Sequence, residues 1–173
     1  SCRGLPMLIL LKWLVLVAIA LVVGLLAAGQ MGALKGTRPA DLGVKNGRLK
    51  PPSNTPNSVS SQTALHPGHP MAADATIAPL PLHGDAAATI RGLQQVVAAQ
   101  RGAAVVEQGP DYLYAQFTTP ALQFVDDVEF WVDPSAGVVQ VRSASRIGRK
   151  DFGVNRARIE SLRTQSAAKA SGG

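Results

Sequence analysis

The feature that most constrains the fold of this chain is an almost unbroken apolar run from Leu5 to Leu34. A helix needs about 20 apolar residues to cross the hydrocarbon layer of a bilayer, and this run supplies them. Lys12 and Trp13 stand near its start, and both side chains suit the membrane interface. The alternative is a cleaved signal peptide with its cleavage site at residues 27–29, but its apolar part is usually only about 7–15 residues long. The sequence therefore predicts a single transmembrane anchor over residues 1–34.

The net charge of the 173-residue chain is +6, which suits an anionic partner but is equally typical of a solvated basic surface. Nucleic acid is not expected as a partner, because the basic residues are not interleaved with aromatic side chains on which bases could stack. The single cysteine, Cys2, cannot form an internal disulfide. Its place beside the apolar run would suit acylation, but one cysteine is a weak signal.

Residues 35–81 differ sharply from the apolar run, because they are rich in proline, asparagine and serine. Proline lacks a backbone donor and restricts the residue before it, so a regular helix is not expected here. We expect an extended segment that docks on the following domain. His66 and His69 lie in this segment without a cysteine or an acid at ligand spacing, so no metal site is predicted.

Residues 82–163 carry the periodic patterns of a folded domain. Asp85 is suited to cap a helix over residues 86–100, and Gly102 ends that helix. The expected fold class is α+β, with two layers, an antiparallel sheet of about four strands, and two helices. The strands are expected over residues 105–107, 112–117, 124–132 and 138–145, the second helix near residues 155–163, and a flexible tail over residues 164–173.

The third and fourth expected strands place acids close to basic residues. Successive side chains of a strand point to opposite faces, so Asp126 and Asp127 are separated. If the hairpin closes symmetrically about Ser135, Arg142 lies diagonal to Asp126 on one face, within reach of a long side chain. Arg146 falls on the same face. The sequence therefore predicts an aspartate–arginine network within the sheet.

Three interpretations of these charges remain open. The first is structural, because charges in a partly apolar setting must be paired, and arginine–carboxylate pairs hold strand register. The second is an anion site, in which arginines, two serines and the N-terminus of the last helix hold a phosphate or carboxylate. The third is catalysis by the acids, but no known catalytic motif is present, and no catalytic residue or cofactor is predicted. The candidate residues are Asp126, Asp127, Glu129, Arg142, Ser143, Ser145, Arg146, Asp151, Asn155, Arg156 and Arg158.

Several long motifs resemble a known family. They are PADLGV at 39–44, TPNSVSSQ at 55–62, FVDDVEF at 124–130, RSASRIG at 142–148 and DFGVNRARIE at 151–160. The chain is similar to members of the bacterial and plastid domain-of-unknown-function family numbered fourteen ninety-nine. The resemblance implies a compact domain, often behind a membrane anchor or export signal, with thylakoid-associated plastid relatives and no known reaction. Many members carry a cysteine pair where this chain has Pro52 and Ser58.

The anchor and the resemblance together lead to an expected function. We expect a membrane-anchored accessory or interaction protein, a subunit or assembly factor of an energy-converting photosynthetic or respiratory membrane complex. The alternatives are a binder of an anionic lipid or phosphate ligand and, less favoured, a hydrolase using Asp126 or Asp127. The expected partners are membrane lipids and other membrane-protein subunits, which small residues such as Gly24 and Gly32 would allow to pack closely.

The expected location is an inner or photosynthetic membrane that the chain crosses once. Basic residues between Lys35 and Lys50 would, by the positive-inside rule, keep the following domain in the cytoplasm. The family resemblance favours the opposite side of the membrane. We therefore expect an extracytoplasmic, periplasmic domain.

Overall fold

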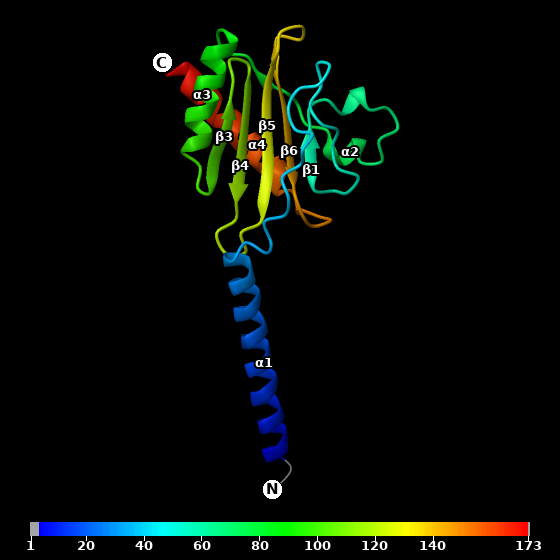
Figure 1. The fold of residues 1–173 in the computed structure, drawn as a ribbon, viewed down its shortest axis with the longest axis vertical. Coiled ribbons are helices and arrows are strands. Elements are labelled where there is room, and N and C mark those ends of the chain that lie inside the picture. The colour runs from blue at the N-terminus through cyan, green and yellow to red at the C-terminus, as the bar shows by residue number, and fades with distance from the viewer. Residues whose placement is uncertain (1–3, 173) are drawn as a thin grey trace.

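A long helix projects from one end of a mixed domain in the computed structural model, which describes residues 4–172 (Figure 1). This helix, α1 (Gly4–Gln30), exposes every side chain from Met7 to Ala27. The stretch Met7–Gln30 is long and apolar enough to cross a membrane. Cys2 lies outside the described residues.

An antiparallel sheet of six strands forms the centre of the domain. Its order is β1-β6-β5-β4-β3, and β2 pairs with β6 on the same edge as β1. The last four strands along the chain follow one another as hairpins. The strands are β1 (Ser58–Ser60), β2 (Leu80–Pro81), β3 (Ala103–Gln108), β4 (Tyr112–Thr118), β5 (Val125–Asp133) and β6 (Val138–Ser145).

The sheet has two more strands than the sequence predicted, and both belong to the proline-rich segment. β1 and β2 contain three and two residues, which is too short for an alternating pattern to be recognised. β6 holds both of them, since Ser58 pairs with Ala144 and Leu80 pairs with Val139. The proline-rich segment therefore docks partly by adding strands to one edge of the sheet.

Helix α3 (Ala86–Ala98) covers part of one face of the sheet. The Asp85 carboxylate caps it by accepting a hydrogen bond from the Ala88 N–H at 2.6 Å. Two shorter helices, η1 (Thr63–Leu65) and α2 (Ala72–Ala75), lie in the proline-rich segment.

Helix α4 (Val154–Ser171) crosses behind the strands on the same face as α3 (Figure 1). It continues well beyond Arg163, through most of the residues 164–173 for which the sequence predicted a flexible tail. Alanine, the strongest helix former, is frequent in these last turns, and Ser166 is buried against the domain. Helix propensity and packing together therefore extend α4.

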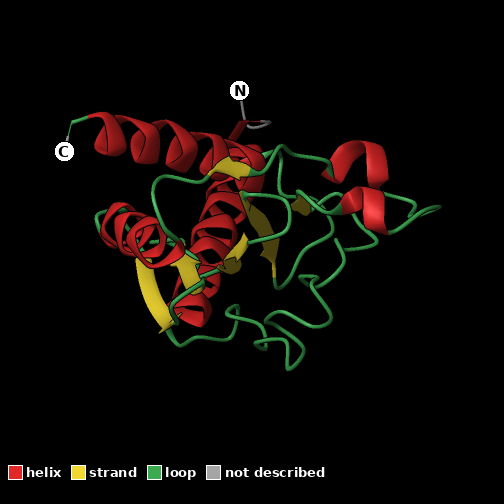
Figure 2. Cartoon of the chain, turned by 90° about the horizontal axis from the view of Figure 1, so that it is seen from above, coloured by secondary structure: helices red, strands yellow, loops and turns green. Residues whose placement is uncertain are grey.

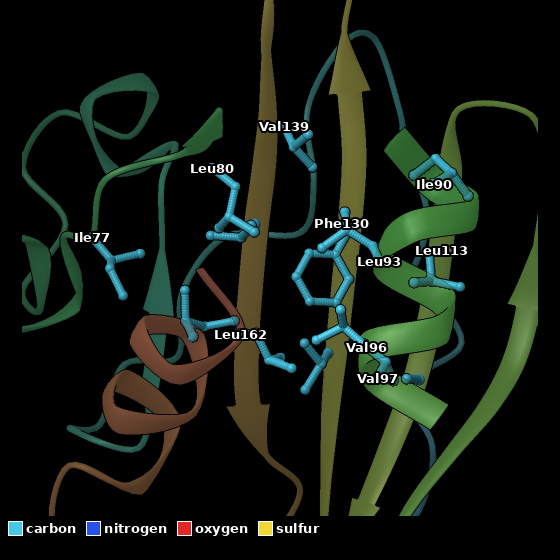
Figure 3. Packing of buried hydrophobic residues seen from close by; sticks show 14 of the residues in the cluster. Ile77, Leu80, Ile90, Leu93, Val96, Val97, Leu113, Phe130, Val139 and Leu162 are labelled. Atoms are coloured by element: carbon cyan, nitrogen blue, oxygen red, sulfur yellow. The ribbon is translucent and has the colours of Figure 1, made fainter. Parts of the chain in front are cut away.

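The hydrophobic core lies between the two helices and the sheet. Strand alternation points every second residue of β4, β5 and β6 toward α3 and α4. Figure 3 shows Phe130 of β5 in the middle of this cluster. The strand residues of the core are Leu113, Ala115, Phe117, Val128, Phe130, Val132, Val139 and Val141, and the helices add Ile90, Leu93, Val96, Val97, Ile159 and Leu162.

The opposite face of the sheet is polar, and the proline-rich segment covers it. Arg38 lies over the Tyr114 ring, 4.4 Å from its centroid, and a Cβ placed on Gly47 would lie 3.9 Å from the Trp131 ring. Figure 2 shows helices on one side of the strands and irregular loops on the other. Because both faces are covered, every residue of β5 is buried.

The end of α1 rests directly on the loop between β4 and β5. The Gln30 side-chain amide donates hydrogen bonds to the carbonyl oxygens of Pro120 at 3.0 Å and Ala121 at 2.9 Å. Gly29 approaches the same loop so closely that a Cβ there would lie 2.8 Å from the Leu122 carbonyl oxygen. Hydrogen bonds and backbone contact therefore fix the helix on the domain.

We predict that Gly29→Ala loosens this junction without unfolding the domain. The added methyl group would clash with backbone atoms of Leu122, which cannot move aside as a flexible side chain would. Amide hydrogen exchange in the loop 119–124 should become faster. Gly24→Ala is the matched control, because no atom lies within 4 Å of a Cβ at Gly24. Equal exchange in the two variants would contradict a close junction.

Candidate functional site

The turn between β5 and β6 decides which charged residues meet. Asp133 pairs with Val138, so four residues, 134–137, form the turn, and the hairpin is not centred on Ser135. Gly137 has a φ of +65°, and its N–H donates to the Asp133 carbonyl oxygen at 2.9 Å. Glycine readily adopts this left-handed conformation, so Gly137 allows the chain to close the turn at this position.

This turn shifts the register of β6 by one residue from the symmetric hairpin. Arg142 pairs with Glu129, and Asp126 pairs with Ser145. A shift of one residue moves a side chain to the other face of a sheet. The predicted contact between Arg142 and Asp126 is therefore wrong, because the two side chains lie on opposite faces.

On the polar face, the Asp127 carboxylate forms a two-point ion pair with Arg146. The Arg146 Nε lies 2.9 Å from one carboxylate oxygen and its Nη2 lies 2.7 Å from the other. The hydrogen bond to Asp127 raises the pKa of the Arg146 guanidinium. The Tyr114 hydroxyl also donates to Asp127, at 2.5 Å, and burial together with this carboxylate raises the pKa of Tyr114. The carboxylate is thus fully occupied by partners within the chain.

Glu129 and Arg142 form a second pair on the polar face, and they are only 0% and 2% exposed. Their closest atoms, Oε2 and Nη1, are 3.7 Å apart. The other Glu129 oxygen accepts hydrogen bonds from the Gly43 N–H at 2.7 Å and the Tyr112 hydroxyl at 2.9 Å. Arg142 Nε donates to the Pro51 carbonyl oxygen at 3.2 Å. The covering segment thus supplies partners to both members of the pair.

Burial dominates the electrostatics of this second pair. Loss of hydration raises the pKa of the Glu129 carboxyl and lowers the pKa of the Arg142 guanidinium. The Gly43 N–H, Arg142 and the Tyr112 hydroxyl oppose the rise at Glu129 without overcoming it. Glu129 Oε2 and Arg142 Nη1 have no hydrogen-bond partner among the described residues. The attraction between the two opposite charges therefore offsets part of the cost of burying these two atoms.

On the helical face, Asn155 at the start of α4 joins several segments of the chain. It is fully buried, and its amide nitrogen donates to the Asn57 carbonyl oxygen at 3.1 Å and the Ser145 hydroxyl at 3.0 Å. It also donates to the Asp151 carboxylate at 2.8 Å. The Asn155 side-chain oxygen accepts a hydrogen bond from the Ser143 hydroxyl at 2.5 Å. One side chain thus links β6, α4 and the proline-rich segment.

Asp151 caps the start of α4 and supports Asn155. Its carboxylate accepts hydrogen bonds from the backbone N–H groups of Gly153 and Asn155, both at 3.0 Å. Burial raises the pKa of Asp151, but these hydrogen bonds outweigh burial and hold the pKa below its usual range. The helix N-terminus is therefore occupied by a side chain of the protein itself.

Asp126 pairs with Arg158 of α4, at 2.5 Å. Arg158 also donates to the Ser143 hydroxyl at 3.1 Å and the Asn155 side-chain oxygen at 2.8 Å. Its guanidinium lies 4.7 Å from the centroid of the Phe117 ring. The pair therefore ties α4 to the sheet and joins the Asn155 cluster.

The candidate residues fall into separate groups, and they do not form one site. Arg156 lies apart from the others and donates to the backbone carbonyl oxygens of Asp74 at 2.9 Å and Thr76 at 2.8 Å. The first group, on the helical face, is Asp126, Ser143, Ser145, Asp151, Asn155 and Arg158; the second and third, on the polar face, are Asp127 with Arg146 and Glu129 with Arg142.

This arrangement offers little to an anion. Each candidate arginine already contacts a carboxylate or a backbone carbonyl oxygen. An open hollow of about 330 Å³ beside the start of α4 is lined by Lys150 and Arg156, but also by Asp74 and Asp151. The acids and bases of its lining balance, so the hollow has no strong preference for an anionic ligand.

The acids are equally ill placed for catalysis. Glu129 has the raised pKa that a general acid needs, but it is fully buried beneath Gly43. Among residues 4–172, no group of three or more histidines, cysteines, aspartates or glutamates is placed to hold a metal ion. The arrangement holds elements together by pairing buried charges.

Sequence reasoning missed the tyrosines and the backbone partners of the acids. Tyr112 and Tyr114 could have been found, because both alternate onto the polar face opposite Glu129 and neighbouring residues of β5. Gly43 and Pro51 act through backbone groups. No side-chain pattern in the sequence marks such contacts.

The fold and these networks define a small α+β domain that follows an apolar helix and is organised by buried acid–arginine pairs. The family described as protein of unknown function (DUF1499) matches residues 48–165. The chain therefore belongs to this family, as the sequence motifs predicted. The matched range includes every candidate residue and begins after the PADLGV motif. Comparisons with curated proteins and with solved structures gave no match.

We predict that Asn155→Ala destabilises the domain by about 3 kcal/mol, because several buried groups lose their partner and each costs about 1–3 kcal/mol. Urea unfolding of the full chain in detergent, followed by circular dichroism, measures this loss. Asn54→Ala, in an exposed turn, is the control and should change stability by less than about 0.5 kcal/mol. Similar losses of stability in the two variants would show that the hydrogen bonds of Asn155 do not hold these segments together.

A double-mutant cycle tests the Glu129–Arg142 pair. Glu129→Gln or Arg142→Met alone should cost about 3–5 kcal/mol, because each leaves a buried charge without its partner. The double variant should recover more than half of the summed loss, since no charge remains buried. Additive losses in urea unfolding would mean that the two side chains do not stabilise each other.

The same pair predicts a pH dependence. Because the pKa of Glu129 is raised in the folded state, its contribution to stability is fully present below the pKa of an unfolded glutamate. That contribution is lost as the pH rises through the folded-state pKa. The wild-type chain should therefore lose stability over this range, and the double variant should lose less in the same unfolding experiment. Parallel pH profiles would contradict the raised pKa.

Proposed function

We propose that this chain is a membrane-anchored, non-enzymatic accessory protein whose domain is held in a fixed orientation for contact with other membrane-protein subunits. The observation that carries the proposal is the direct seating of α1 on the loop between β4 and β5. Gln30 and Gly29 make this contact without an intervening flexible linker. A fixed orientation suits an interaction protein, because it removes part of the entropy cost of docking.

The surface of α1 supports anchoring and helix association. Its side chains from Met7 to Ala27 are exposed, and a helix of this composition would bury them in a bilayer. Gly24 has no neighbour within 4 Å, so another transmembrane helix could approach closely there. Gly29, in contrast, already contacts the domain of the same chain.

The proposed setting is an energy-converting photosynthetic or respiratory membrane, in which the chain serves a complex as a subunit or assembly factor. Its support is the family resemblance, which includes thylakoid-associated plastid relatives. An extracytoplasmic domain is proposed on the same basis. Ser58, at the position of one family cysteine, accepts a hydrogen bond from the Ser53 N–H at 2.8 Å, so this turn is closed without a disulfide.

The alternatives have less support from the geometry. A hydrolase would need an accessible acid, and Asp126 and Asp127 are both buried and paired with arginines. A phosphate site built from the candidate arginines would need at least one of them to be released from its present partner. Release of Arg142, Arg146 or Arg158 would leave a buried acid unpaired.

Purification of the intact chain from its native membrane in mild detergent tests the proposal. We expect a stoichiometric membrane protein to co-purify and to be identified by mass spectrometry. A variant with α1 replaced by a polyleucine helix separates contacts made by α1 from contacts made by the domain. A lone monomer in both preparations would overturn the proposal.

A further inference from the structure

One aromatic side chain takes no part in the core or the polar networks. Phe152, between β6 and α4, is 86% exposed and has a φ of +55°. Left-handed backbone is unfavourable for an aromatic residue, and exposure of the ring to water is unfavourable as well. A residue that persists despite both costs is a reason to look for a function.

The loop that carries Phe152 is held in place. The Gly148 carbonyl oxygen accepts a hydrogen bond from the Asn57 side chain at 2.7 Å. The Asp151 N–H donates to the Pro56 carbonyl oxygen at 3.3 Å, and the Asp151 carboxylate caps α4. The exposed ring is therefore presented by a fixed backbone.

This loop lies at the end of the domain that faces α1. Its first residue, Arg146, donates its N–H to the carbonyl oxygen of Val125, at the start of β5. The loop before β5 is the one that contacts Gln30. The chain leaving α1 also packs here, since a Cβ on Gly36 would lie 2.9 Å from Ile147. Figure 1 shows the orange loop after β6 on the α1 side of the domain.

Asp74 and Asp151 line the hollow beside the ring, but the exposed cations and apolar side chains of the loop match the chemistry of a lipid surface. Arg149 and Lys150 are exposed, and the Lys150 ammonium lies 5.8 Å from the centroid of the Phe152 ring. Val154 adds a second apolar side chain that is 49% exposed. Aromatic residues favour the membrane interface, and adjacent cations bind anionic headgroups.

We infer that the loop 149–154 is a second membrane contact. Phe152 enters the headgroup region of the bilayer that α1 crosses, and Arg149 and Lys150 bind the phosphate groups of anionic lipids. A lipid surface is favoured over a protein partner because anchoring by α1 places this end of the domain beside the bilayer. The inference rests on the proposed anchoring by α1.

A nitroxide label on Val154→Cys, in a Cys2→Ser background, tests the contact in the intact chain. The chain is reconstituted in nanodiscs of phosphatidylcholine, with or without phosphatidylglycerol. We expect the label to be shielded from a water-soluble nickel chelate in anionic discs and less shielded in neutral ones. Lys150→Ala should reduce the ratio of lipid-bound to unbound loop 149–154 about fivefold, because one basic residue near an anionic surface strengthens binding by about that factor.

Phe152→Asn is the decisive variant. Asparagine tolerates left-handed backbone, so the thermal unfolding midpoint should stay the same or rise. Shielding of the label at position 154 should nevertheless fall. A lower unfolding midpoint with unchanged shielding would assign Phe152 a structural role and overturn the inference.

Two further labels separate this inference from the anchoring on which it rests. A label at Val22 on α1 should be shielded in every disc, and a label at Ala136, in the distant turn between β5 and β6, should be accessible. If the Val22 label is accessible, anchoring itself fails. If the Val22 label is shielded while the Val154 label is as accessible as the Ala136 label, anchoring stands and the second contact is overturned.

Discussion

A carboxylate that loses its hydration must find a partner within the chain, and this requirement organises both faces of β5. The strand carries four acids. Three of them each meet an arginine from a different position, Arg158 in α4, Arg146 after β6 and Arg142 within β6, and the fourth, Asp133, accepts hydrogen bonds from Ser135 and Gln140. The pairs therefore join the central strand to a helix, a loop and a neighbouring strand. Apolar contacts could bring the same elements together, but they would fix the register less strictly.

The sequence was most informative where a local rule decides the outcome. Strand alternation separated Asp126 from Asp127, and the acid before the first helix of the domain identified its cap at Asp85. The partners of the acids depended on one residue of turn length, which charge patterning does not determine. The lengths of β1 and β2 were also beyond local patterns, because packing against the rest of the domain sets them. The alanines after Arg163, in contrast, are a local signal for the longer α4.

The partners supplied by the proline-rich segment are a second feature that the sequence did not predict. Gly43 and Pro51 contribute a backbone N–H and a backbone carbonyl oxygen, which are groups that nearly every residue carries. What selects them is the path of the covering segment over the sheet. That path follows from many weak contacts that are far apart along the chain. The sequence therefore predicted that the segment docks on the domain, but it did not predict the face that the segment covers or the hydrogen bonds that it makes.

The distance along the chain between the cover and the sheet has a consequence for how the protein folds. The Gly43 N–H meets a carboxylate 86 residues further on, so the segment that is synthesised first can close only after β4, β5 and β6 have paired. Contacts of such long range form slowly, because a large loop must be closed before they are gained. During that interval the polar face of the sheet is hydrated, and its charges are tolerated by water. Closure of the cover is therefore the step that converts a wet charged surface into a dry interior, and a nascent chain is exposed to wrong partners until it occurs.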